Sequence, residues 1–314
     1  MITLNVLVKR ILQYGVSIFL FWNLLVAVRA YNFTHFKTVS TNTVPMQASM
    51  LSYLSGRING ANYYKKPITQ FPNSAYISVT LTTTDELNLE AWYIPTTNAT
   101  GTVLIVHGYG QNKQDMLSEA RGFEKMGYNA LLIDCRGHGN SQGNTSTLGL
   151  TESKDVLTAY NYIKQKGEKN IILYGASMGA AAISHCVSKY GITPTKVVLD
   201  MPFANYEQLS EYFIKRGKYP SRPTASLFTF WSSVMNQQWF YSIKPSEYVK
   251  TLKCPTLLQW GVHDDLVPES ATKLIYANIT SDKTLQVYAN SAHENFSVCE
   301  PLVWQSTVSK FMMQ

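Results

Sequence analysis

The distribution of apolar and polar positions divides the chain into three regions. An apolar run over residues 11–28 comes first, interrupted only by Gln13, Ser17 and Asn23. Residues 31–75 are polar and aromatic without a sustained period. In the remainder of the chain, short apolar runs alternate with segments whose apolar residues recur at helical spacing. The pattern predicts an N-terminal apolar segment, a spacer and one large folded domain.

The third region, residues 76–314, alternates strands with helices. Residues 76–81 and 87–94 carry β-branched and aromatic side chains on either side of a turn at 84–86, which predicts an antiparallel hairpin. Single strands and helices then alternate, as in the βαβ units of a mostly parallel sheet. The further strands are expected at 102–106, 128–133, 171–174, 196–199, 256–259 and 285–288. The helices are expected at 114–126, 152–166, 178–189, 269–278 and 302–313.

The first apolar run has the length of a membrane-spanning helix, which needs about 17–25 residues. The apolar core of a signal peptide has about 7–15, so we expect residues 1–30 to be a membrane anchor. A weak cleavage site before Tyr31 leaves a secreted or periplasmic protein as the alternative. Lys9 and Arg10 before the run predict a single-pass protein whose folded domain lies on the non-cytoplasmic side. Residues 31–75 are expected to be a spacer with a short helix near 46–57.

Composition narrows the range of partners. The 45% of apolar and 15% of charged residues are ordinary for a globular protein, and the net charge is +7. No nucleic-acid motif accompanies this charge, so we expect no nucleic acid; the basic residues near 215–222 favour an anionic membrane surface instead. The four cysteines form neither C-x-x-C nor a Cys/His spacing, and no nucleotide fingerprint occurs, so we expect no metal and no cofactor. Disulfides and the oligomeric state stay open.

One stretch of the sequence contains a candidate catalytic motif. Residues 171–174 form an apolar run that meets Gly175-Ala176-Ser177-Met178-Gly179, and a run of small residues follows. A buried strand turning sharply into a helix has this pattern, with glycines where side chains would clash. The residue at the tip, Ser177, would then present its hydroxyl at a helix N-terminus, which favours negative charge. The pattern predicts Ser177 as a nucleophile.

A serine nucleophile needs a histidine base and a carboxylate that holds its tautomer. His293 follows the expected strand at 285–288, and Asp264 follows the one at 256–259, which is the Ser-acid-His order of hydrolases with this elbow. Asp264 lies between Gly261 and Pro268, in a loop suited to a fixed acid. Asp265 and Asp200 remain alternative acids.

The reaction also needs two N–H donors for a tetrahedral oxyanion. The residue after the nucleophile, Met178, supplies one in this type of elbow. The glycine-rich loop His107-Gly108-Tyr109-Gly110 follows the strand at 102–106 and lets the backbone turn inward. We therefore expect the N–H of Tyr109 to be the second donor.

With these motifs assembled, the sequence resembles the α/β-hydrolase superfamily over about residues 76–314. It looks most like the branch of monoacylglycerol lipases, serine aminopeptidase-like hydrolases and membrane-anchored relatives. The resemblance implies an α/β class with a mostly parallel eight-stranded sheet, helices on both faces and a small cap inserted at about 203–253. It also implies that Ser177, Asp264 and His293 are the nucleophile, acid and base. Ala292 departs from the glycine that relatives often have before this histidine.

The expected function is hydrolysis of carboxylic esters, of lipids or other acyl groups. Aromatic residues are dense over residues 203–253, beside the expected site, which favours an apolar acyl pocket as much as simple packing of the cap. A serine peptidase or amidase is the alternative, since the same residues serve both reactions. A non-catalytic binding protein on this fold is the third hypothesis. The natural substrate is not determined by these patterns.

Overall fold

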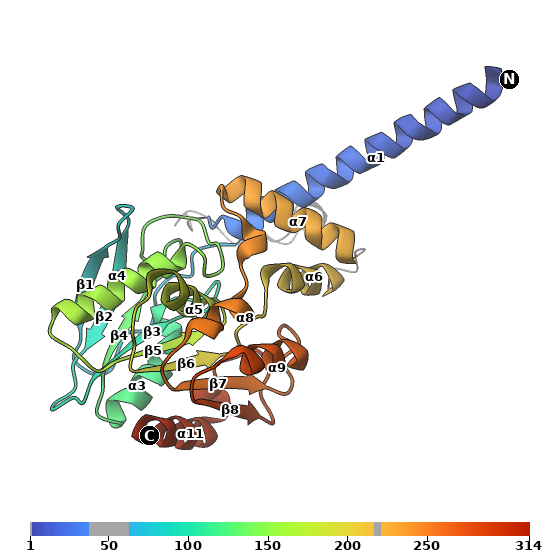
Figure 1. Ribbon diagram of the computed structural model, residues 1–314. Coiled ribbons are helices and arrows are strands. Elements are labelled where there is room, and N and C mark those ends of the chain that lie inside the picture. Colours follow the sequence, from blue (N-terminus) through green and yellow to red (C-terminus); the bar gives the residue numbers. More distant parts are fainter. Residues whose placement is uncertain (1, 38–62, 217–220) are drawn as a thin grey trace.

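The computed structural model describes residues 2–37, 63–216 and 221–314. Its centre is an eight-stranded sheet in the order β1-β2-β4-β3-β5-β6-β7-β8 (Figure 1). β2 runs antiparallel to both of its neighbours, and all other neighbouring strands are parallel. The strands are β1 (Ile77–Thr82), β2 (Asn88–Ile94), β3 (Thr102–Val106), β4 (Asn129–Ile133), β5 (Ile171–Ala176), β6 (Lys196–Asp200), β7 (Thr256–Gly261) and β8 (Lys283–Tyr288).

Period-two side-chain alternation in the central strands builds two cores, one on each face of the sheet. In β3, Leu104 and Val106 join one core, while Val103 and Ile105 join the other. Because both faces of β3 and β5 are covered, every residue of these two strands is buried, which explains their continuous apolar runs. The first core is shared with α4 (Glu152–Gln165), α5 (Met178–Tyr190) and α9 (Glu269–Asn278), and the second with α3 (Leu117–Lys125) and α11 (Pro301–Met313). The predicted α/β class, with helices on both faces, is confirmed.

The expected helix at 114–126 is two elements. A 3-10 turn, η1 (Lys113–Met116), precedes α3. The Asn112 side chain accepts from the Gln114 N–H, and Asp115 accepts from the Asn112 N–H, which is a capping box. The cap therefore begins the helical segment earlier than the apolar spacing predicts.

The described residues between β6 and β7 are mostly helical, and the first two helices lie above the C-terminal ends of the strands (Figure 1). These two are α6 (Tyr206–Arg216) and α7 (Ser221–Asn236), which pack against each other and which we call the cap helices. The turns η2 (Phe240–Ser242), α8 (Pro245–Tyr248) and η3 (Val249–Thr251) lead back to the sheet. The short α10 (Phe296–Cys299) precedes α11. This helical stretch occupies the segment in which we expected a cap.

The N-terminal helix does not stop where we placed the end of the anchor. α1 (Ile2–Thr34) continues past Ala30 to Thr34 and projects far from the domain at its other end (Figure 1). Its stretch from Val6 is long and apolar enough to cross a membrane. Val26, Ala30 and Phe33 recur at helical spacing and are buried, and α1 packs against α7. The helix persists because this apolar stripe is stabilised by the cap. The short helix expected near 46–57 lies outside the described residues.

Candidate active site

Ser177 occupies the sharp turn between β5 and α5. Its backbone has φ 52° and ψ −108°, a strained conformation for a residue with a side chain. A Cβ on Gly179 would lie 2.3 Å from the carbonyl oxygen of Val106, so no other residue fits there. A Cβ on Gly175 would lie 2.6 Å from the Gly179 carbonyl carbon. Strand, turn and helix thus have the arrangement that the glycine-serine pattern predicts.

Three of the predicted residues form a continuous hydrogen-bonded chain. Nε2 of His293 lies 3.0 Å from Oγ of Ser177, and Nδ1 lies 2.8 Å from Oδ2 of Asp264. The ionised carboxylate of Asp264 can only accept, so Nδ1 carries the proton and Nε2 accepts from the serine hydroxyl. This is the tautomer that a general base requires.

The carboxylate of Asp264 is held in place by its own loop. Its side chain is fully buried, and Oδ1 accepts the N–H groups of Leu266 at 2.9 Å and Val267 at 2.7 Å. Two backbone donors and the imidazole therefore fix the orientation of this carboxylate.

The two alternative acids lie elsewhere. Asp265 is exposed on the outer side of the same loop. Asp200 is buried beneath the site, where it accepts from the hydroxyl of Tyr174 and from Nε2 of Gln259 at 2.6 Å. Burial raises the pKa of the Asp200 carboxyl to about 8. The carboxylate that is hydrogen-bonded to Nδ1 of His293 is that of Asp264.

The loop after β3 is pinned by a buried histidine. His107 donates from Nδ1 to the carbonyl of Gly108 at 2.7 Å and accepts the Cys135 N–H at Nε2 over 3.0 Å. Burial lowers the pKa of the His107 imidazole to about 4, so it stays neutral and keeps both bonds. The Gly108 N–H donates to the side chain of Gln111 at 2.9 Å. Within the described chain, the Tyr109 N–H donates to no protein acceptor and remains available at the site.

Met178 begins α5 directly after Ser177, where N–H groups of a first helical turn have no intrahelical acceptor. Its side chain is buried, and its sulfur accepts from the Ser146 hydroxyl at 3.3 Å. Tyr109 thus lies on the loop after β3, and Met178 lies at the start of α5. Their roles as oxyanion donors remain a prediction.

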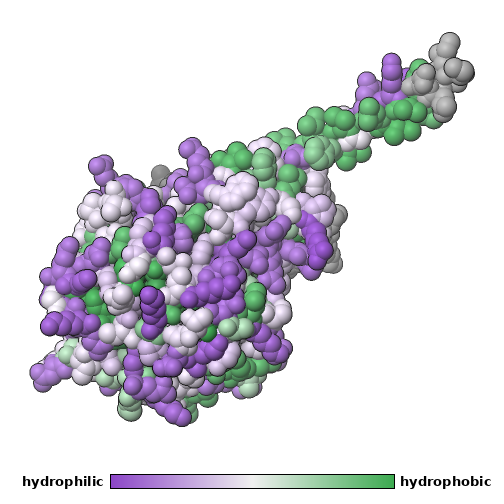
Figure 2. Space-filling view, in the orientation of Figure 1, coloured by the Kyte–Doolittle hydropathy of each residue, from purple (hydrophilic) through white to green (hydrophobic). Residues whose placement is uncertain are grey.

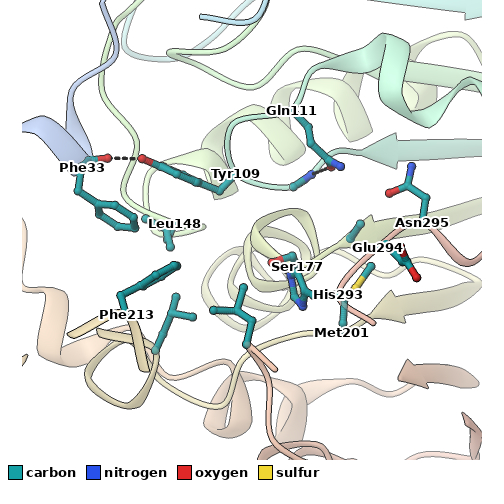
Figure 3. Close-up of a pocket in the computed structure, with 14 residues that line it drawn as sticks. Phe33, Tyr109, Gln111, Leu148, Ser177, Met201, Phe213, His293, Glu294 and Asn295 are labelled. Atoms are coloured by element: carbon teal, nitrogen blue, oxygen red, sulfur yellow. Dashed lines mark hydrogen bonds between the residues drawn. The ribbon is translucent and has the colours of Figure 1, made fainter. Parts of the chain in front are cut away.

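Phe33 is a site residue that sequence reasoning missed. The hydroxyl of Tyr109 donates to the Phe33 carbonyl, and the two rings stack with centroids 4.8 Å apart (Figure 3). Phe33 also packs against Phe213 of α6 and Phe228 of α7, with centroids 5.4 and 5.5 Å apart. We had assigned this residue to the spacer. The helical recurrence of Val26, Ala30 and Phe33 was the available signal.

A cavity of about 210 Å³ opens beside the Ser177 hydroxyl. Its two ends differ in character (Figure 3). The apolar end is lined by Phe33, Leu148, Leu209, Phe213 and Leu266. The polar end is lined by Gln111, His293, Glu294 and Asn295.

Comparison with known families gives one match within the folded domain. The family described as serine aminopeptidase, S33, matches residues 97–247, which include the elbow and the cap helices.

Relatives and solved structures extend the likeness. The Saccharomyces cerevisiae protein YNL320W, named as a membrane protein, is 25% identical over 82% of this chain and 87% of its own. The lysophosphatidylserine lipase ABHD12 of Danio rerio is 29% identical over 51% of this chain and 42% of its own. The Pyrococcus furiosus esterase Pf2001 superimposes with a TM-score of 0.67, at 24% identity, over 80% of this chain and 98% of its own. The last of these likenesses is one of fold.

Proposed function

Because this chain belongs to the α/β-hydrolase superfamily, we propose that it is a serine hydrolase that cleaves carboxylic esters through Ser177, His293 and Asp264. The observation that carries the proposal is the hydrogen-bonded chain from the Ser177 hydroxyl through His293 to the buried Asp264. A serine on a strained elbow, in contact with an imidazole in the tautomer of a general base, is the arrangement of an activated nucleophile.

The reaction proceeds in two halves. Oγ of Ser177 attacks the acyl carbon while its proton passes to Nε2 of His293. The oxyanion of the tetrahedral intermediate accepts the N–H groups of Tyr109 and Met178. Collapse of the intermediate expels the alcohol, which takes the proton from His293 and leaves an acyl-serine. Water then attacks the acyl-serine, gives its proton to His293, and the carboxylic acid departs as Ser177 regains a proton.

The shape of the cavity supports an apolar acyl group. Phe33 and Phe213 lie at the end of the cavity away from His293. The volume of about 210 Å³ is below the range of about 300–1,000 Å³ usual for sites that enclose a whole drug-sized ligand. A lipid ester would therefore place part of its acyl chain inside and its remaining parts outside. A lipase among the relatives and an esterase among the solved structures agree with this substrate class.

A peptidase or amidase is the second candidate, and one residue favours it. The carboxylate of Glu294 follows His293 directly and lines the polar end of the cavity. It accepts the Ala292 N–H at 3.1 Å, which holds it near the site. A carboxylate in this position could bind the ammonium group of an aminoacyl substrate, and the matching family is described as an aminopeptidase.

We also propose that α1 anchors the hydrolase in a membrane. The stretch Val6–Thr34 meets the length and hydropathy of a spanning helix, and only its last turns are covered by the domain. Removal of the helix as a signal sequence is the alternative. Sequencing of the native N-terminus decides between them, since a mature protein that begins near Tyr31 would exclude the anchor.

The reaction is tested with the purified full chain in detergent. A fluorophosphonate probe should label the wild type, and Ser177→Ala should abolish the labelling while circular dichroism stays unchanged. Rates on p-nitrophenyl esters of increasing chain length should exceed those on aminoacyl anilides. Labelling that survives in Ser177→Ala would overturn the assignment of the nucleophile. Faster cleavage of the anilides, lost in Glu294→Gln, would favour the aminopeptidase instead.

A further inference from the structure

The outer cap helix has a surface unlike that of an ordinary amphipathic helix. No charged residue lies between Arg222, at the start of α7, and Lys244, which follows η2. Three apolar side chains of this segment are exposed, with 44% of Phe230, 48% of Val234 and 63% of Trp239 accessible. Exposed faces of soluble helices are normally polar or charged. An uncharged face with exposed aromatic residues indicates contact with an apolar phase.

The length of α1 indicates how close the folded domain lies to a bilayer. The 18 residues of the apolar run at 11–28 extend about 27 Å as a helix, and the hydrocarbon core of a bilayer is about 30 Å thick. The whole run is therefore needed to span it. Yet Val26 and Ala27, near the end of the run, are already buried, and α1 packs there against α7. The spanning segment and the docked segment of α1 overlap.

Charged residues limit any sliding of the helix. Lys9 and Arg10 precede the run, and Arg29 follows it, so both ends favour the polar interfaces. The residues of α1 between Val6 and Phe21 are exposed on the helix that projects from the domain. In Figure 2 the apolar surface of α1 continues at its base onto the part of the domain where Figure 1 shows α7. The domain cannot retreat from the bilayer without pulling apolar residues of α1 into water.

We propose that α7 and the following segment as far as Trp239 form a bilayer-contact surface, with Phe230, Val234 and Trp239 among the lipid headgroups and upper acyl chains. This inference rests on the membrane anchoring proposed above. Tryptophan suits this depth because its amphipathic ring prefers the membrane interface. Phenylalanine is common on the apolar face of helices that lie in the interface. The bilayer-contact surface lies one helix layer from the apolar end of the cavity, since Phe228 of α7 packs on Phe33. A lipid ester then reaches the site from the membrane.

The surface is tested by measuring the depth of single residues in vesicles. The full chain carries four free cysteines, of which Cys135 and Cys186 are buried. Replacing Cys254 and Cys299 by serine gives a background for single-cysteine variants labelled with the fluorophore NBD. Phe230→Cys, Val234→Cys and Trp239→Cys report the proposed surface in vesicles of phosphatidylcholine and phosphatidylglycerol that contain nitroxide-labelled lipid.

Two further positions serve as controls. Ile18→Cys on the projecting part of α1 reports insertion of the anchor. Leu302→Cys is the matched control, because Leu302 is an apolar residue with 82% of its surface exposed on α11, at the far side of the domain from α1 (Figure 1).

The expected result is strong quenching by the nitroxide lipid at 18, 230, 234 and 239, at least about threefold greater than at 302. Quenching at 18 alone, with 230 and 234 no different from 302, would overturn the bilayer-contact surface and leave the anchor standing. No quenching at 18 would overturn both. Oxidative cross-linking between two copies at 230, without quenching there, would assign the surface to a second copy of this chain and also overturn the proposal.

A kinetic experiment tests the bilayer-contact surface independently. The double variant Phe230→Asp/Val234→Asp should lose at least about tenfold in activity on a long-chain ester embedded in vesicles. Its activity on a water-soluble short-chain ester should stay within about twofold of the wild type, because neither residue lines the cavity. Leu302→Asp is the matched control and should change neither rate. Equal losses on both esters, or no loss on either, would contradict a role in reaching the bilayer.

Discussion

The lower and upper sides of the active site are built in different ways. The lower side consists of loops at the ends of β3, β5, β7 and β8, and its functional atoms are set by hydrogen bonds of 2.7–3.0 Å. The upper side consists of α1 and the cap helices, whose rings contact one another with centroids 5.4–5.5 Å apart. Directional bonds lose strength steeply when their geometry changes, whereas apolar packing tolerates changes of similar volume. In the proposed hydrolase, the lower side would therefore determine whether the reaction occurs, and the upper side which acyl group enters.

The largest effect is expected on the lower side. Asp264→Asn should lower kcat by about 10⁴-fold, because an amide no longer holds the His293 tautomer with a proton on Nδ1. Steady-state kinetics on a short ester measures this, with Asp265→Asn as the matched control, since its side chain lies on the outer side of the same loop. A crippled Asp265→Asn together with an active Asp264→Asn would reverse the assignment of the acid.

A smaller effect, on selectivity for the length of the acyl chain, is expected on the upper side. Phe33→Leu keeps the main-chain carbonyl that Tyr109 binds but shortens the wall of the cavity. One or two additional methylenes should be accepted, each worth about 0.8 kcal/mol, or about fourfold in the ratio of kcat/KM for longer over shorter esters.

The corresponding control is Phe228→Leu, which alters the ring packed behind Phe33 without altering the lining of the cavity. An unchanged chain-length profile in Phe33→Leu would mean that Phe33 does not limit the acyl group.

A third effect concerns stability rather than turnover. The pKa of Asp200 is raised to about 8 in the folded protein, against about 3.9 in an unfolded chain. Between these values the folded state retains a proton that the unfolded state has lost, so stability falls as pH rises from about 4 to 8. Asp200→Asn removes this contribution. Its thermal midpoint should decline less than that of the wild type between pH 5.5 and 8; parallel declines would contradict the raised pKa.

The lower side of the site could be predicted from the sequence, and the upper side could not. The strand Thr102–Val106 and the helix Glu269–Asn278 have the predicted bounds, because continuous apolar runs and helical spacing are local signals. Ser177, Asp264 and His293 were found from glycine patterns and strand ends, which are also local. Their predicted proximity agrees with the distances in the structure.

Phe33 could not be found in this way. Its place in the site depends on Tyr109, 76 residues further along the chain, and on rings of both cap helices. The helical recurrence of Val26, Ala30 and Phe33 indicates that this face of α1 is buried, but tertiary packing decides which residues the face contacts. The helices α6 and α7 were likewise expected only as an insertion, since their aromatic residues fit packing as well as substrate binding.

The contact between Tyr109 and Phe33 has a consequence for biosynthesis. α1 precedes every strand of the sheet, so an anchoring α1 enters the membrane before the loops that carry Ser177 and His293 have been made. The domain must then fold against a helix that is already inserted, and the wall formed by Phe33 is completed there. The proposed hydrolase would then acquire the wall that limits its acyl group only once the domain has folded against α1.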